Sequence, residues 1–154
     1  MTDGEYQRHI AVRLSSPDQV RDHVLRSVAR RSMDERWHLA LAGELKHSKL
    51  VIADGFIHRN NTNSEIGWGL DPSHWHRGLG RELVAALLAL AIEHLDSERV
   101  WCKVMSGNAA SVSLARRAGF KWAKSSPDYP VGGGRSAAVQ FFSMSRECYL
   151  HLPY

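Results

Sequence analysis

The feature that most constrains the fold is an apolar helix pattern between Gly80 and Asp96. Its apolar residues recur at helical spacing and form a stripe of Leu83, Leu87, Ala91 and Leu95, widened by Val84, Leu88 and Ile92. A stripe this wide indicates burial against a β-sheet, because the seam of a coiled coil is narrower. The longest apolar run, Leu83–Ile92, is too short for a membrane span. We therefore predict a helix packed on a sheet.

The segments around this helix predict a mixed α/β domain. Strand-like stretches cover residues 9–14, 37–41, 50–58, 65–70, 99–105 and 137–144, and further helical stretches cover 15–32 and 108–118. A polar turn at 59–63 predicts an antiparallel hairpin, residues 80–105 predict a crossover helix and strand, and residues 127–135 predict a loop. We expect one domain over residues 1–154, with an α/β (α+β) fold whose mixed, mostly antiparallel sheet has about six to seven strands flanked by helices.

Composition and charge narrow the class of protein. Hydrophobic residues make up 44% of the 154 residues and charged residues 23%, which is typical of soluble globular proteins. The N-terminus lacks the pattern of a signal peptide, so we expect a cytoplasmic protein with no membrane partner. Cys102 is predicted to be a buried, unreactive thiol, and His74 and His76 lack a third ligand, so no metal site is expected. The net charge of +4 fits an anionic partner, but arginines on a solvated helix between residues 8 and 36 account for much of it.

The segment Trp75–Arg81 has the composition of an anion-binding turn. It lies between a predicted strand and the start of the long helix, where unpaired N–H groups and the positive end of the helix dipole attract anions. Gly78 and Gly80 let the backbone approach a ligand closely, and Arg77 and Arg81 add positive charge. The spacing of the Walker motif and the third glycine of the dinucleotide fingerprint are both missing. The turn therefore predicts a pyrophosphate site of another kind.

Two motifs together resemble the GNAT superfamily of N-acetyltransferases. Trp75–Gly80 looks like the family's R/Q-x-x-G-x-G/A loop, and Asn108–Phe120 looks like the Asn-x-x-Ser helix ending in Gly-Phe that follows the strand beside the acetyl-CoA cleft. Trp75 and the segment Glu65–Pro72 are similar to the branch that contains the ribosomal-protein and aminoglycoside-type acetyltransferases. The resemblance implies a GNAT fold, with an acetyl-CoA-binding core at 37–122, an N-terminal strand and helix on the acceptor side at 1–36, and a C-terminal loop and strand at 123–154.

The resemblance also implies a set of cofactor contacts and no metal. These are backbone contacts to the pantetheine arm from Trp68, Gly69 and Leu70, pyrophosphate contacts from His76, Arg77, Gly78, Leu79, Gly80 and Arg81, and contacts near the pantetheine end and the sulfur from Asn108 and Ser111. In the family, a backbone N–H near the thioester carbonyl also stabilises the oxyanion of the tetrahedral intermediate. The acyl donor is expected to be acetyl-CoA.

The chemistry of the family is direct attack of a neutral amine on the thioester within a ternary complex. Many members protonate the departing thiolate with a Tyr; Ala115 takes that place here, and Ser111 is the predicted substitute. Lys103 takes the place of a Glu found in members that act on ribosomal protein, which argues against that activity. Glu65 is the predicted base, although an exposed strand carboxylate is an equally good interpretation. Three histidines, His58, His74 and His76, could take the proton in place of Glu65.

Three functions follow, in order of support. The first is an acetyl-CoA-dependent N-acetyltransferase acting on a small-molecule amine or a protein N-terminus, and homodimers are frequent in this family. The second is a non-catalytic acyl-CoA-binding or sensing domain on the same fold, which the Ala at position 115 keeps open. The third, a nucleic-acid-binding module, rests on charge alone.

Overall fold

The computed structural model describes residues 38–132 and 134–153, together with residues 16, 18, 19, 21, 22, 25 and 26. The predicted strand at 9–14 lies outside the described residues. Within the helix predicted at 15–32, the positions described between 18 and 26 are helical.

A six-stranded sheet with the order β1-β2-β3-β4-β6-β5 forms the centre of the described structure. Its strands are β1 (His38–Glu44), β2 (Val51–Asn60), β3 (Asn63–Leu70), β4 (Arg99–Met105), β5 (Lys121–Gly132) and β6 (Arg135–Ser145). Neighbouring strands are antiparallel except β3 and β4, which are parallel. The crossover between β3 and β4 contains the long apolar helix. The predicted mixed, mostly antiparallel sheet and its crossover are confirmed.

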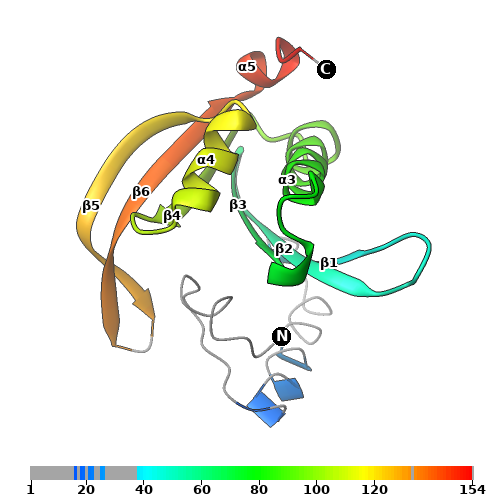
Figure 1. The fold of residues 1–154 in the computed structure, drawn as a ribbon. Coiled ribbons are helices and arrows are strands. Elements are labelled where there is room, and N and C mark those ends of the chain that lie inside the picture. The colour runs from blue at the N-terminus through cyan, green and yellow to red at the C-terminus, as the bar shows by residue number, and fades with distance from the viewer. Residues whose placement is uncertain are drawn as a thin grey trace.

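Helices cover one face of this sheet (Figure 1). They are α3 (Leu79–Ala89), continued by the π-helical turn η2 (Leu90–His94), and α4 (Ala109–Arg117), while the short α5 (Arg146–Leu150) follows the last strand. The predicted apolar stripe is buried at Val84, Leu87, Leu88, Ala91 and Ile92 against sheet residues such as Ile57 and Ile66. The stripe prediction is confirmed. No helix among the described residues is long and apolar enough to cross a membrane.

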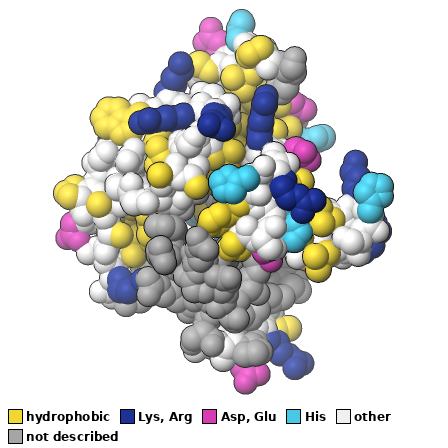
Figure 2. Space-filling model, viewed as in Figure 1, with side chains coloured by type: hydrophobic (Ala, Val, Ile, Leu, Met, Phe, Trp, Pro, Cys, Tyr) yellow, Lys and Arg dark blue, Asp and Glu magenta, His cyan; other side chains and the backbone are white. Residues whose placement is uncertain are grey.

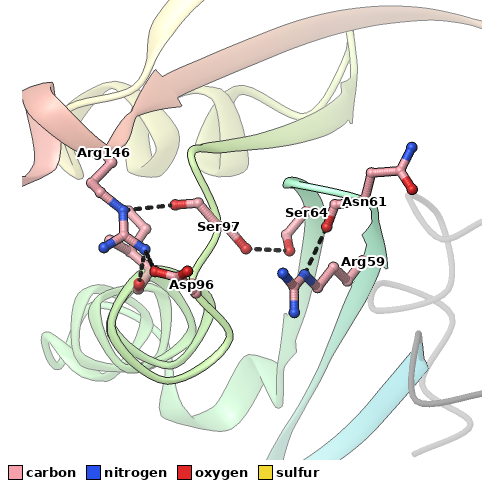
Figure 3. A network of polar contacts seen from close by, with 7 residues as sticks. Arg59, Asn61, Ser64, Asp96, Ser97 and Arg146 are labelled. Atoms are coloured by element: carbon pink, nitrogen blue, oxygen red, sulfur yellow. Dashed lines mark hydrogen bonds and ion pairs between the residues drawn. The ribbon is translucent and has the colours of Figure 1, made fainter.

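The π-helical turn ties the end of the crossover helix to the rest of the molecule (Figure 3). The Leu95 N–H donates to the Leu90 carbonyl at 3.0 Å, five residues back, and this wider turn leaves the Ile92 carbonyl for Arg146. The Arg146 guanidinium donates to that carbonyl at 2.7 Å, to Asp96 at 2.6 Å and to the Ser97 carbonyl at 3.2 Å.

The same network reaches β3 through Ser97. Its buried hydroxyl lies 2.7 Å from the hydroxyl of Ser64 in β3, next to the point where β4 begins (Figure 3). In addition, the Glu98 N–H donates to the Thr62 carbonyl at 2.7 Å in the turn between β2 and β3. These bonds hold the first residues of β3 and β4 side by side.

The prediction of a loop at 127–135 is wrong. Most of it belongs to β5, which continues to Gly132, and only the turn before Arg135 is left between β5 and β6. The strand accommodates Pro127 and Pro130 because β5 is the edge of the sheet and its pairing with β6 is interrupted between Ser126 and Tyr129 and again before Gly132. A proline without an N–H costs no ladder bond at such positions. The helix α5 was not predicted; the Ser145 hydroxyl caps it by accepting from the Cys148 N–H at 3.2 Å.

Candidate active site

The parallel strands β3 and β4 separate part-way along their length. Their pairing consists of Asn63 with Arg99, Ser64 with Val100, and Glu65 with Trp101, although β3 continues to Leu70 and β4 to Met105. Beyond Glu65 and Trp101 each strand therefore turns an edge toward the other without a ladder between them. We call this region the β3–β4 split.

The backbone of β3 presents alternate residues to the split. The Asp71 N–H donates to the Ile52 carbonyl of the β2 side at 2.8 Å. Because N–H and C=O groups alternate between the two edges of a strand, Gly69 points toward β2, whereas Trp68 and Leu70 point toward the split. Of the three predicted pantetheine contacts, the backbone groups of Trp68 and Leu70 therefore face the split, and those of Gly69 do not. The Leu70 carbonyl accepts from the Trp75 indole N–H at 2.8 Å, which ties the predicted pyrophosphate loop to the end of β3.

That loop ends at the start of α3, where free amides are present. Gly78 is the N-cap, and its carbonyl accepts from the Arg81 N–H at 3.0 Å and from the Glu82 N–H at 3.3 Å. The N–H groups of Leu79 and Gly80 precede the first of these bonds and have no partner within the helix. No side chain in the described structure caps this helix start. These amides, at the positive end of the helix dipole, can bind an anion.

The two glycines of the loop serve different purposes. Gly78 has φ of 81°, and a Cβ placed there would meet no atom within 4 Å, so the residue is exposed and needs glycine for its left-handed backbone. A Cβ on Gly80 would lie 3.2 Å from a methyl carbon of Leu114, so this glycine allows α3 to pack closely on α4. The left-handed turn also includes His76, with φ of 60°.

Exposed positive side chains occur at the helix start and at the end of α4. His76, Arg77 and Arg81 are all exposed. Figure 2 shows several Lys and Arg side chains on the face that carries α3 and α4. Arg116 and Arg117, at the end of α4, are exposed as well. This charge and the free amides together suit a ligand with more than one negative charge.

The turn between β3 and the loop is held by Asp71. Its carboxylate accepts from the Ser73 N–H at 2.9 Å and from the Ser73 hydroxyl at 2.6 Å. The hydroxyl bond, followed by the backbone bond and by the nearby His74 ring, holds the pKa of Asp71 below its ordinary value. His74 is itself engaged, since its Nδ1 lies 2.9 Å from the Ser73 hydroxyl. This arrangement fits a structural role for His74 in the turn.

The second motif forms the start of α4. Asn108 is its N-cap, and the side-chain carbonyl accepts from the Ser111 N–H at 3.0 Å. The Asn-x-x-Ser spacing therefore has a local structural reason. Ser111 is partly buried in the first turn, and Ala115, one turn further, is fully buried. The place of the family's Tyr thus holds a small core residue.

Glu65 lies where the split begins, and Lys103 covers it. The residue is only 8% exposed, so the interpretation of Glu65 as an exposed strand carboxylate is wrong. Its Oε1 lies 2.8 Å from the Lys103 Nζ in an ion pair whose angles fall short of a regular hydrogen bond. The Lys103 side chain keeps 33% of its surface exposed and lies near the rings of Trp101 and Tyr129, at 5.8 and 5.4 Å from their centroids. The exposed His58 pairs with Glu65 across β2 and β3.

Cys102, between Trp101 and Lys103 in β4, points the other way. It is 1% exposed in the core, and burial raises the pKa of its thiol to about 12, with the Glu65 charge as a smaller cause. A thiol with this pKa is a poor nucleophile at neutral pH, so the prediction of a buried, unreactive Cys102 is confirmed.

Comparison with known proteins decides the family. The model of the acetyltransferase (GNAT) domain matches residues 1–121. The chain belongs to the GNAT acetyltransferase family. A curated relative, an uncharacterized N-acetyltransferase p20 from Bacillus licheniformis, is 27% identical over 121 residues, which are 72% of this chain and 68% of the relative.

Solved structures share the fold of this GNAT chain. A GNAT-family acetyltransferase from Bacillus anthracis matches with a TM-score of 0.81 at 14% identity, over 95% of this chain and 84% of that one. A spermidine N-acetyltransferase SpeG mutant from Vibrio cholerae matches at 0.73 and 18%, over 90% and 80%. A putative ribosomal-protein-serine acetyltransferase, also from Vibrio cholerae, matches at 0.76 and 16%, over 84% and 75%. The predicted family and fold are confirmed.

Sequence reasoning missed one feature of this GNAT site. Lys103 was considered only as a replacement for a family Glu, but it is the partner of Glu65. The signal that could have found it is the parallel pairing of the crossover strands, since Lys103 comes two residues after Trp101, the partner of Glu65. Side chains two residues apart on a strand lie on the same face of the sheet.

Proposed function

We propose that this acetyltransferase transfers an acetyl group from acetyl-CoA to a primary amine, by direct attack of the amine within a ternary complex. The observation that carries the proposal is the position of the free α3 amides next to the β3–β4 split. The α3 amides offer an anion site, and the β3–β4 split offers an unpaired strand edge to which an amide-bearing chain can bind. The acceptor is a small-molecule amine or a protein N-terminus.

The described residues fit the parts of acetyl-CoA. The N–H groups of Leu79 and Gly80, with Arg77 and Arg81, would hold the diphosphate, and His76 and Gly78 shape the turn around it. The backbone groups of Trp68 and Leu70 that face the split would bind the pantetheine arm, with Asn108 near its end. The cofactor supplies the activated acyl group as a thioester.

Proton transfer is proposed for two side chains. Glu65 is the base for the acceptor ammonium, acting through water, because Lys103 covers its Oε1 and keeps an ammonium from direct contact. Ser111, in the first turn of α4, relays a proton from water to the departing thiolate. The alternative base is His58, which is exposed and lies opposite Glu65.

Two observations favour a second candidate function, a non-catalytic acyl-CoA-binding or sensing domain. The place of the family's tyrosine acid is taken by Ala115, which is fully buried. The proposed base is paired with Lys103 rather than free. A sensing domain needs the cofactor contacts and neither proton-transfer group.

Calorimetry with acetyl-CoA and an assay of CoA thiol release over an amine panel separate these functions. The expected result is binding of acetyl-CoA together with amine-dependent release of CoA. Binding without release from any amine would support the sensing domain, and the lack of any binding would overturn both functions.

Two variants then test the base. Glu65→Gln is expected to lower kcat by about a hundredfold, within the range for loss of a general base, with little change in the KM for acetyl-CoA. His58→Gln is the comparison variant and is expected to keep kcat within a few-fold of the parent. The reverse order of effects would assign proton removal to His58.

A further inference from the structure

Three strands place two lysines on either side of a phenylalanine. Phe141 of β6 pairs with Lys103 of β4 on one side and with Lys124 of β5 on the other. Directly paired residues of neighbouring strands lie on the same face of a sheet. The Lys124 Nζ lies 5.0 Å from the centroid of the Phe141 ring, and Tyr129 meets that ring edge-on at 5.3 Å. We call this arrangement the Lys103–Phe141–Lys124 row.

The row lies on the face of the sheet opposite α3 and α4. Cys102 and Val104, the neighbours of Lys103 in β4, are buried in the core cluster that includes the residues of α3. Because side chains alternate along a strand, Lys103 points to the other face. The proposed diphosphate site belongs to the helix-bearing face. An acceptor that approaches the split from the face free of α3 and α4 therefore meets the row.

The accessible charge at this place is positive. Glu65, the acid at the start of the split, is 8% exposed and already paired with Lys103. Lys124 is exposed, and no acidic side chain of the described residues forms an ion pair with it. If the acceptor carried a second ammonium besides its reacting amine, the two lysines would repel it, whereas they would attract an anionic group. The rings would cover an apolar part of the ligand.

We propose that the acceptor is an amine that also carries a carboxylate, and that the Lys103–Phe141–Lys124 row binds this carboxylate. The inference rests on the proposed acetyl transfer and names the class of its acceptor. In the reaction the amine nitrogen forms the new amide bond, CoA leaves as its thiol, and the carboxylate is unchanged. A polyamine such as spermidine is a poor acceptor for this chain, although solved structures that share its fold include a spermidine acetyltransferase.

Two matched series of linear amines of increasing length test the proposal, one ending in a carboxylate and the other in a carboxamide, with spermidine as the polycation. We expect the best carboxylate to exceed its carboxamide partner by about tenfold in kcat/KM, as a charge-assisted contact provides. Lys124→Met should remove most of this advantage, because it should lower kcat/KM for the carboxylate more than kcat/KM for the carboxamide. Lys46→Met, in the exposed turn between β1 and β2, is the matched control and should keep the advantage.

The outcomes separate this inference from the proposed function. Transfer to spermidine or to carboxamides as fast as to carboxylates would overturn the inference and leave acetyl transfer standing. Equal losses of kcat/KM for both series in Lys124→Met would also overturn it, because Lys124 would then not distinguish the carboxylate from the carboxamide. A protein that binds no acetyl-CoA would overturn the proposed function, and the inference with it.

Discussion

At the scale of single residues, Glu65 and Lys103 depend on each other. The carboxylate is nearly buried and has the Lys103 ammonium 2.8 Å away. A buried charge that loses its partner keeps the full cost of leaving water. The role of each side chain therefore cannot be assigned without the other, and substitutions at this pair must be made together as well as singly.

Lys103→Met is expected to lower the free energy of unfolding by about 2 kcal/mol, below the usual cost of breaking a buried pair because Lys103 is partly exposed. The double variant Glu65→Gln with Lys103→Met should recover most of this loss, since no charge is left unpaired. Urea denaturation of the parent, both single variants and the double variant measures the coupling. Additive effects of the two substitutions on the free energy of unfolding would contradict an energetic coupling between Glu65 and Lys103.

The two cysteines should react differently. Cys102 is buried with its pKa raised to about 12, whereas Cys148 is exposed on α5. Iodoacetamide at mildly alkaline pH should therefore modify Cys148 alone, and both residues in urea, as mass spectrometry of the peptides would report. Because the pKa of Cys102 is higher in the folded protein than its ordinary value of 9.0, its contribution to stability is complete below pH 9.0 and declines above it. Labelling of Cys102 as fast as Cys148 in the native protein would contradict its burial.

At the scale of elements, the sequence pattern predicted the helices and strands whose apolar face packs against the core. The stripe from Leu83 to Leu95 predicted α3 and its buried face, since the helix packs on the core side of the sheet. The same pattern did not reveal the π-helical turn at its end, where the Ile92 carbonyl accepts from Arg146, far along the chain. Proline and glycine predicted a loop at 127–135, where the edge position of β5 in fact tolerates a bulged strand.

The candidate site was predictable to a similar extent. Each motif marks a local structure, and so the two helix starts were predicted at Gly80 and Asn108; the structure places the N-caps at Gly78, two residues earlier, and at Asn108. The division of Trp68, Gly69 and Leu70 between two edges of β3, and the pairing of Glu65 with Lys103, follow from strand register. Register across a crossover is determined by long-range packing, which one sequence without its structure does not display.

Gly78 allows a direct test of the anion site at the start of α3. Gly78→Asp is expected to weaken the binding of acetyl-CoA by more than about tenfold, because it puts a negative charge beside the free amides. Gly134→Asp is the matched control, since Gly134 also has a positive φ, of 68°, and open space around it, but lies in the turn between β5 and β6. Calorimetry of both variants measures the difference. Equal affinities would refute the loop assignment, whereas Gly80 is a poorer probe because it contacts Leu114.

At the scale of the whole molecule, the fold keeps one pair of strands joined at one end and apart at the other. The Ser64–Ser97 contact and the Arg146 bonds lie at the joined end, together with the three paired positions of β3 and β4. Glu65 is the last of these paired positions, and the split and the α3 amides lie beyond it. Residues that stabilise the fold and residues that could bind ligands are therefore separated along the same two strands, so their variants should have separable effects.

Arg146→Gln tests this separation. The substitution removes bonds to the Ile92 carbonyl and Asp96 and leaves a partly buried carbonyl without its donor, so we expect a loss of about 2 kcal/mol in the free energy of unfolding. The affinity for acetyl-CoA, measured by calorimetry well below the transition temperature, should stay within about twofold, because no contact that Arg146 makes with the described residues reaches the split. Arg99→Gln, an exposed arginine at the start of β4, is the control and should change stability by less than about 0.5 kcal/mol. A large loss of affinity in Arg146→Gln at unchanged stability would mean that the joined end controls the width of the split, and the two ends of the strand pair would then have to be treated as one functional unit.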